Sequence, residues 1–372
     1  MDGYELRSEI LSSGTKYYIQ SNVVPAQHAI VTSLFHEGNL LSKQSERYDG
    51  ALSPEALRTL VRRLHDDRKL RITSLLDIRG QLKQDVDARA HLKLGEALFK
   101  EKMYKEAMAE VVRAVKLGLE DSRGYSILGN CLLALDDHDK ALKSFQKGIE
   151  ISPDYPDLHN DLGATYLRVE RCSEAVEAFE KALSINAYYQ AAYLNLALAL
   201  ALNVVLKQDY ELSRGLPGRL KETLDRNLQL RPSLDTPDFR AAMEALSEER
   251  YDAVYERLRA IYDEQQKIAH SDLSLELYLI MKFRSDQLTD DEIDRYVDRV
   301  KIALEANPGY ADLQNDLGIL YTAKCKILID KANERFQEAL TLNPNFKKAE
   351  KNLKLATNDR QGIHFLLKAL LD

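Results

Sequence analysis

Three consecutive segments of 34 residues repeat one pattern of small and large side chains. They span residues 88–121, 122–155 and 156–189. In the last segment the repeated positions hold Gly163, Tyr166, Ala175, Phe179 and Ala182. Small residues at these positions let two helices approach closely, and the aromatic rings fill the space beside the contact. The repetition therefore predicts stacked helix–turn–helix units, which grow by addition and not by enlarging one core.

The earlier segments carry the same pattern as Leu94-Gly95, Leu128-Gly129 and Ala141 with Phe145. Over roughly the last three quarters of the chain, this pattern resembles the tetratricopeptide repeat (TPR) family. The resemblance implies a mainly α fold, an α-solenoid whose first helices line a concave groove for an extended peptide or a partner helix. The combination with the N-terminal segment described below resembles bacterial cytosolic TPR proteins.

The repeat pattern becomes irregular after residue 189. Residues 190–234 form an extended unit that is too long, which indicates either an insertion near 204–218 or a longer helix kinked at Gly215–Gly218. Residues 235–310 are interpreted as two degenerate units, with Pro308 after the last helix. The pattern returns in 311–346 as Leu317-Gly318-x-x-Tyr321 and Ala332-x-x-x-Phe336, which completes a predicted solenoid over 88–346.

The chain after the solenoid, residues 347–372, is predicted to be a capping helix followed by an apolar tail at Ile363–Leu371. A solenoid needs such a cap because its last unit otherwise leaves an apolar face in water. The tail either folds back on the cap or docks on another copy of the chain.

The first 52 residues differ from the rest, because they are rich in aromatic and β-branched residues at Tyr17–Ile19 and Ala29–Phe35. Glu37-Gly38-Asn39 is typical of a hairpin turn, and Pro25 should end a strand. We expect a small antiparallel sheet of three or four strands. An exposed edge strand there would allow pairing with another chain, so a homodimer through the sheet is one hypothesis and a homodimer through the C-terminal tail is another.

A long amphipathic helix and a junction are predicted over residues 53–87, with Ser53 as the helix cap and Pro54 in the first turn. One side of this helix is basic: Arg58, Arg62, Arg63, Arg68, Lys69 and Arg71. Two interpretations fit this run. It is either a solvated helix face or a surface over 58–71 that binds nucleic acid or membranes.

Composition limits the function classes. The chain has 372 residues, of which 45% are hydrophobic, and a net charge of −7, so general affinity for nucleic acid is not expected. Its three cysteines are scattered and predicted to be reduced, in a cytoplasmic protein. No phosphate-binding, dinucleotide, serine-nucleophile or zinc motif occurs. The apolar stretch 191–206 is interpreted as a buried repeat helix, since it is too short to span a membrane. We therefore expect no enzyme activity, no cofactor, no metal and no membrane span.

The predicted function is a protein–protein interaction scaffold or adaptor that binds a peptide or a partner protein in the groove. Asparagine side chains donate and accept hydrogen bonds and so suit a peptide backbone, while apolar neighbours seat side chains. The candidate groove residues are Lys93, Phe99, Arg123, Ile127, Asn130, Asn160, Leu167 and Asn195.

Overall fold

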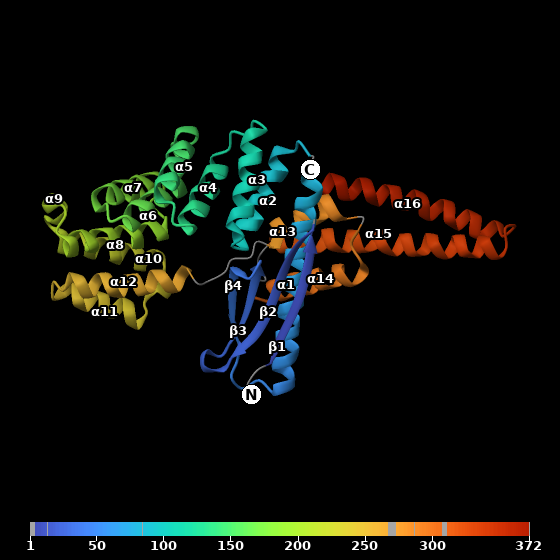
Figure 1. Cartoon of the computed structure of the whole chain (residues 1–372), viewed down its shortest axis with the longest axis horizontal. Helices are drawn as coiled ribbons and strands as arrows, with labels where there is room; N and C mark the ends of the chain where they lie inside the picture. Colours follow the sequence, from blue (N-terminus) through green and yellow to red (C-terminus); the bar gives the residue numbers. More distant parts are fainter. Residues whose placement is uncertain are drawn as a thin grey trace. The chain divides into compact units, whose positions relative to one another are not determined.

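The chain divides into two compact units (Figure 1). The repeat region spans Asp87–His270, and the sheet–hairpin region combines Met1–Val86 with Ser271–Asp372. The structure, a computed structural model, describes residues 4–12, 14–83, 85–266, 273–285, 287–306 and 311–371. It confirms the mainly α fold class: a TPR-like helical solenoid preceded by a small antiparallel sheet and a long helix.

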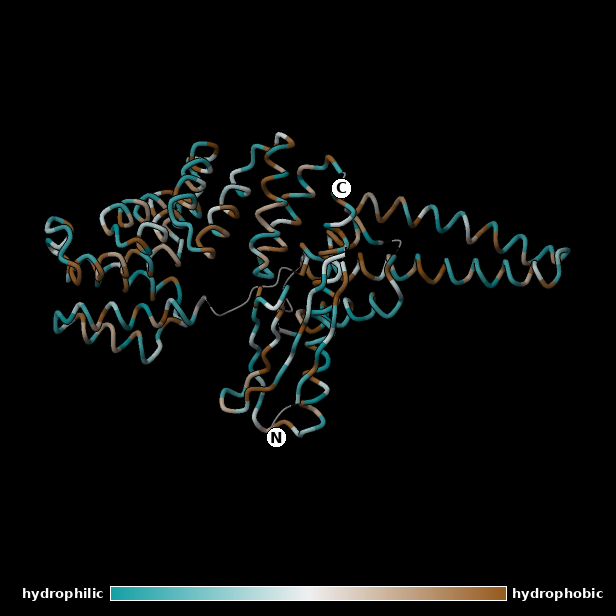
Figure 2. Tube along the Cα trace, viewed as in Figure 1, coloured by the Kyte–Doolittle hydropathy of each residue, from teal (hydrophilic) through white to brown (hydrophobic). Residues whose placement is uncertain are grey.

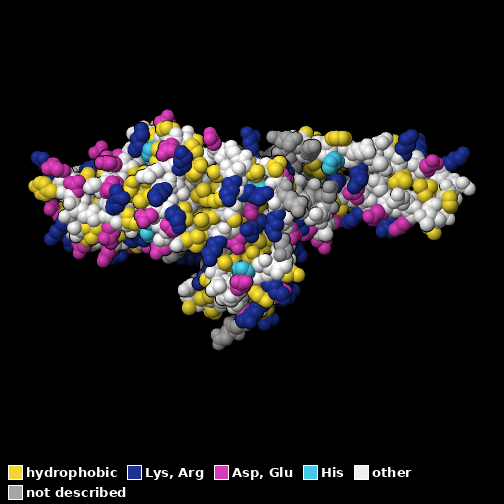
Figure 3. Space-filling model, turned by 45° about the horizontal axis from the view of Figure 1, so that its top comes forward, with side chains coloured by type: hydrophobic (Ala, Val, Ile, Leu, Met, Phe, Trp, Pro, Cys, Tyr) yellow, Lys and Arg dark blue, Asp and Glu magenta, His cyan; other side chains and the backbone are white. Residues whose placement is uncertain are grey.

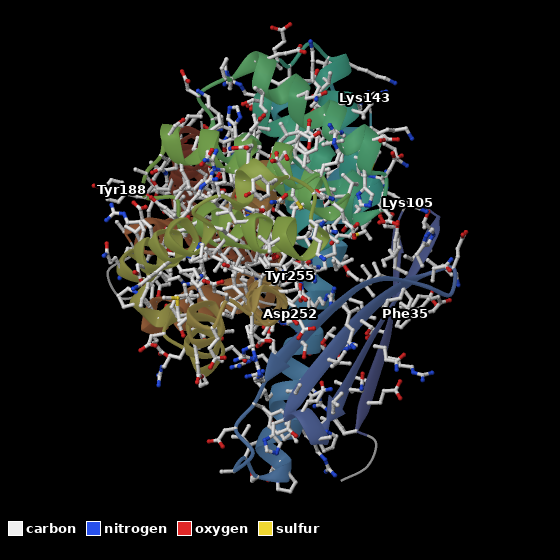
Figure 4. The ribbon with its side chains drawn as sticks, turned by 90° about the vertical axis from the view of Figure 1, so that its left-hand side faces the viewer. Phe35, Lys105, Lys143, Tyr188, Asp252 and Tyr255 are labelled. Atoms are coloured by element: carbon white, nitrogen blue, oxygen red, sulfur yellow. The ribbon has the colours of Figure 1, made fainter. Side chains whose placement is uncertain are left out.

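The repeat region is a series of antiparallel helix pairs. The three regular units are α2 (Ala88–Lys100) with α3 (Tyr104–Lys116), α4 (Ser122–Ala134) with α5 (His138–Ile151), and α6 (Pro156–Arg168) with α7 (Cys172–Ile185). Each first helix also contacts the first helix of the next unit. The second helices expose polar side chains such as Lys105 on α3 and Lys143 on α5 (Figure 4).

Close helix contacts explain the small residues of the pattern. A Cβ atom placed on Gly129 would lie 2.5 Å from a Phe145 ring carbon, and one on Gly163 would lie 2.7 Å from Phe179. Both distances are far shorter than van der Waals contact, so a larger residue would push the second helix away. The small and large positions predicted from the repeat therefore do form the contact within each unit.

The turns between paired helices repeat as well. Lys102, Asp136 and Glu170 have φ values of 62°, 65° and 58°, and they recur at the repeat interval. A left-handed residue at this point ends the first helix and lets the chain reverse within a few residues. The same left-handed turn occurs at Glu249, between α11 (Pro237–Ser247) and α12 (Tyr251–Gln266).

The extended unit contains an insertion and no kinked helix. Helix α8 (Gln190–Leu206) is followed by the short α9 (Tyr210–Ser213) and by α10 (Leu216–Leu230), with Gly215 in a left-handed conformation between the last two. The inserted loop braces the preceding turn, because the Gln208 side chain donates to the Glu170 carbonyl at 2.6 Å. Helix α8 packs against α7, α10 and α12, which explains why it is apolar on all sides. No helix among the described residues is long and apolar enough to cross a membrane.

The N-terminal sheet has four antiparallel strands in chain order: β1 (Glu5–Ser12), β2 (Thr15–Val24), β3 (Ala29–His36) and β4 (Asn39–Arg47). Glu37 and Gly38 both have positive φ, which is the backbone of a tight hairpin turn. Helix α1 (Pro54–Leu82) begins where predicted, since Ser53 accepts a hydrogen bond from the Ala56 amide at 3.2 Å. Its Leu57 and Val61 pack against Ile30 of the sheet.

The prediction of repeat units after residue 270 is wrong. Helix α13 (Leu273–Arg284) packs mainly on α1, and α14 (Asp290–Ala306) pairs with α15 (Ala311–Leu342). The expected helix–turn–helix unit at 311–346 is the single helix α15, followed by α16 (Lys347–Leu371) in one long hairpin. A Cβ on Gly318 would meet nothing within 4 Å, so this glycine makes no close helix contact. Pro308 lies outside the described residues.

Two physical reasons explain this difference. Residues Thr322–Ile329 contain no glycine, proline, asparagine or aspartate that would favour a turn, so the helix continues through them. The predicted cap and apolar tail likewise form one helix, α16, which runs back along α15. The small and large residues of 311–346 therefore match the repeat pattern, although the turn that a repeat unit requires is missing.

Candidate functional site

A polar cluster joins two first helices of the repeat region. Asn130 on α4 donates to the Asp161 carboxylate on α6 at 2.8 Å, and to the Ser126 carbonyl at 3.1 Å. The Ser126 hydroxyl donates to the same Asp161 oxygen at 3.1 Å. Both Asn130 and Asp161 are half-buried, so the cluster stays in reach of a ligand. The helix stacking brings these residues together across about one repeat length in sequence.

The charge at the centre of this cluster is weakened by its surroundings. Burial raises the pKa of Asp161 to about 6. The hydrogen bonds from Asn130 and Ser126 lower this pKa, but they do not cancel the effect of burial. Burial also raises the pKa of Tyr155 and of Tyr189, and the neighbouring Asp157 carboxylate raises both further. The start of α6 thus presents two carboxylates beside two protonated phenols.

Tyr155 and Tyr189 lie beside this cluster, and they were missed in the sequence analysis. Each stands directly before a first helix, as the N-cap residue of α6 and of α8. They occupy the same position in consecutive repeats, so the recurrence of an aromatic residue at the repeat interval was the available signal.

Asn160 and Asn195 do not line an open surface, which corrects their predicted exposure. Their side chains are 7% and 4% exposed, and the Asn195 amide donates to the Asn160 carbonyl oxygen at 2.8 Å. A buried amide must find a partner. Here Asn160 accepts from Asn195, and it also hydrogen-bonds to Asp161. The pair locks α6 to α8. Ile127 is also buried, at 8% exposure, and belongs to the packing between helices.

The other predicted groove residues are accessible but lie around the cluster without joining it. Arg123 donates to the Asp121 carboxylate at 3.2 Å, and this hydrogen bond raises its pKa. Phe99 is half-buried and contacts the Tyr104 ring in a tilted arrangement, with ring centres 5.8 Å apart. Leu167 packs against the core around α8, and Lys93 is half-buried. Of the eight predicted residues, Asn130 and Asn160 are hydrogen-bonded to the Asp161 carboxylate among the described contacts.

Part of the basic run of α1 is buried, so fewer of its residues are available for the predicted nucleic-acid or membrane surface over 58–71. Arg68 is 2% exposed and donates to the Ser42 hydroxyl at 2.6 Å and to the Thr32 carbonyl. Arg71 pairs with the buried Glu276 at 3.3 Å. The two arginines therefore hold α1 to its neighbours in the sheet–hairpin region, and only part of the basic run faces solvent.

A pocket of about 380 Å³ lies in the sheet–hairpin region, between the end of β2 and the start of α1. Sequence reasoning did not predict it. Its walls include aromatic, apolar and basic side chains: Tyr4, His28, Tyr48, Leu57 and Arg58.

Histidine and cysteine side chains have structural surroundings. His159 is hydrogen-bonded through Nε2 to the Pro153 carbonyl at 2.7 Å. Burial raises the pKa of the Cys131 thiol to about 12 and that of Cys172 to about 11, while Cys325 is exposed. Within the described part of the chain, no group of three His, Cys, Asp or Glu residues is placed to hold a metal ion.

The stacked helix pairs of Asp87–His270 define a helical-repeat protein. Residues 120–187 match the family model of the tetratricopeptide repeat, so this part of the chain consists of TPR units. The match covers α4 to α7, which carry the Asn130–Asp161 cluster. No curated protein sequence matches the chain.

Solved structures of TPR proteins are similar to parts of the chain. The structure of MamA has 24% identity and a TM-score of 0.38, covering 45% of this chain and 94% of its own. YrrB, described as a TPR protein with an unusual peptide-binding site, has 22% identity and a TM-score of 0.35, covering 45% and 81%. The pilF protein of Pseudomonas aeruginosa has 16% identity and a TM-score of 0.37, covering 61% and 95%. Likeness at this level concerns the fold alone.

Proposed function

We propose that the protein is a non-enzymatic scaffold or adaptor, which binds a peptide segment of a partner protein on the surface formed by α4, α6 and the residues that precede α6 and α8. We call this the first-helix surface. The observation that supports it best is the half-buried Asn130–Asp161 pair beside Tyr155 and Tyr189. We also propose a cytoplasmic location.

The chemistry of the pair suits a peptide backbone. Asn130 uses its amide donor within the cluster, which leaves the carboxamide oxygen as an acceptor for a ligand N–H. The aromatic faces of Tyr155 and Tyr189 offer contact area at a small entropic cost. Binding through such groups depends little on salt, in contrast to binding through exposed arginines.

Peptide display followed by fluorescence anisotropy tests the proposal. Peptides selected on the full chain are measured against wild type and Asn130→Ala/Tyr189→Ala. We expect an affinity loss of at least about tenfold, because removing central interface residues typically costs more than 1 kcal/mol each. The matched control is Lys105→Ala/Lys143→Ala on the second helices, which should bind as wild type does. Peptides that bind all three proteins equally would refute the proposal.

A further inference from the structure

The hairpin of α15 and α16 lacks a core of its own over most of its length. Among its described side chains, none beyond Lys326 in α15 is buried, and only Ala349 and Leu367 are buried in α16. Helix α14 supports the base of the hairpin, where Asp290 pairs with Lys331 at 2.7 Å. Two helices that bury so little apolar surface against each other gain little stability from packing.

Large apolar side chains nevertheless remain exposed along both helices. Leu342 is 88% exposed and Phe365 is 69% exposed. Brown, hydrophobic positions recur along both helices in Figure 2, and yellow, hydrophobic side chains are visible on the surface of the hairpin in Figure 3. Among the described side chains, the exposed large apolar residues of the hairpin are Tyr321, Leu328, Leu342, Phe346, Leu355, Phe365, Leu366 and Leu370. A concentration of this kind marks an interaction surface.

The spacing on α15 fits another helix. Tyr321, Leu328 and Leu342 are separated by one and by two heptads, and the small residues Ala332 and Ala339 lie between them on the same stripe. A heptad spacing keeps one seam of a helix against a neighbouring helix over many turns. The uncovered partner surface is therefore expected to be helical.

Size and charge favour a second copy of the same hairpin. A face two helices wide and 25 residues long covers roughly 700 Å², close to the ~800 Å² per partner of a stable complex. Helix α16 is basic, with six Lys or Arg residues against two Asp or Glu, whereas α15 has four against five. A two-fold arrangement places each α16 on the α15 of the other copy, so the favourable contact occurs twice.

We propose that the protein forms a homodimer in which two α15–α16 hairpins pack into a four-helix bundle. The bundle buries the apolar stripes of both copies and gives each hairpin the core that it lacks alone. This interface is separate from the first-helix surface, so the dimer would present two such surfaces.

Sedimentation velocity of the full chain over a concentration series tests the dimer. We expect wild type to dimerise, and Leu355→Glu/Phe365→Glu to raise the dissociation constant at least about tenfold, since it buries charge at the interface. Tyr188→Glu/Tyr210→Glu, which changes exposed residues of the repeat region, is the matched control and should dimerise as wild type does. A wild type that stays monomeric overturns the proposal, as does a dimer that persists in the hairpin variant.

Two further measurements guard against a variant that merely unfolds. Lys351→Glu/Lys354→Glu changes only exposed positions of α16 and should weaken the dimer while the circular dichroism stays unchanged. A spin label on the exposed Cys325 should show coupling between copies in wild type and none in the hairpin variant; Cys131 and Cys172 are buried. Absence of coupling in a wild-type dimer would place the interface elsewhere and reject the hairpin.

Discussion

At the scale of the residue, the same short motif has opposite roles in two places. Gly163 in the repeat region and Gly318 in α15 both follow a leucine and precede a tyrosine by three positions. A Cβ would be 2.7 Å from Phe179 in the first case and would meet nothing within 4 Å in the second. Whether a glycine is needed at this position of the motif therefore depends on how closely another helix approaches it.

Alanine substitution separates the two glycines. Gly163→Ala should destabilise the protein by about 1–3 kcal/mol, because it overpacks a tight helix contact. Gly318→Ala should stabilise α15 by about 0.5–1 kcal/mol, because alanine favours a helix interior. Urea unfolding followed by circular dichroism measures both. Equal effects of the two substitutions would mean that the repeat contact is not as tight as described.

The raised pKa of Asp161 predicts a pH dependence with a definite sign. The folded protein binds this proton up to a pKa of about 6, above the usual value of 3.8, so stability falls as pH rises between these values. Asp161→Asn keeps the shape and removes the titration. Relative to wild type it should gain up to about 3 kcal/mol between pH 4 and pH 7. A constant difference over this range, in unfolding experiments at several pH values, would contradict the burial of the carboxyl.

At the scale of the element, helices α1, α13 and α14 are held by a buried ion network. Glu276 on α13 accepts two hydrogen bonds from Arg299 on α14, at 2.9 and 2.8 Å, and pairs with Arg71 on α1. Burial opposes ionisation of Glu276, but the two arginines outweigh it and hold its pKa below the usual value. The basic run of α1 was predicted as a surface because its partner lies some 200 residues later in the chain.

Removing the central carboxylate should therefore be costly. Glu276→Gln removes the buried carboxylate that pairs with both Arg71 and Arg299, and we expect a loss of about 3–5 kcal/mol in the free energy of unfolding. Glu350→Gln, on the exposed side of α16, should change it by less than about 0.5 kcal/mol. Thermal and urea unfolding provide the comparison. If the two variants were equally stable, the network would not hold these helices together.

At the scale of the whole molecule, local patterns predicted what depends on neighbours in sequence. The regular units, the strand turn at Glu37-Gly38 and the start of α1 at Ser53 were all readable, because each rests on short-range sterics or capping. The structure after residue 270 depends on contacts with α1 and on the continuation of α15 through the expected turn. Repeat periodicity carries information on neither, so it wrongly predicted repeat units there. In the candidate site, Asn130 was predicted as a groove residue. Tyr155 and Tyr189 were missed although they recur at the repeat interval, because their place beside Asp161 follows from the stacking of units.

The central claim is that the first-helix surface binds a peptide. Hydrogen-exchange mass spectrometry of the full chain, with and without a display-selected peptide, tests it most directly. We predict added protection in α4 and α6 and in the residues before α8, with α3 and α5 little changed, because the bound peptide restricts opening of the helices that it touches. Protection confined to α1, or to α15 and α16, would contradict the account and move the binding function to the sheet–hairpin region.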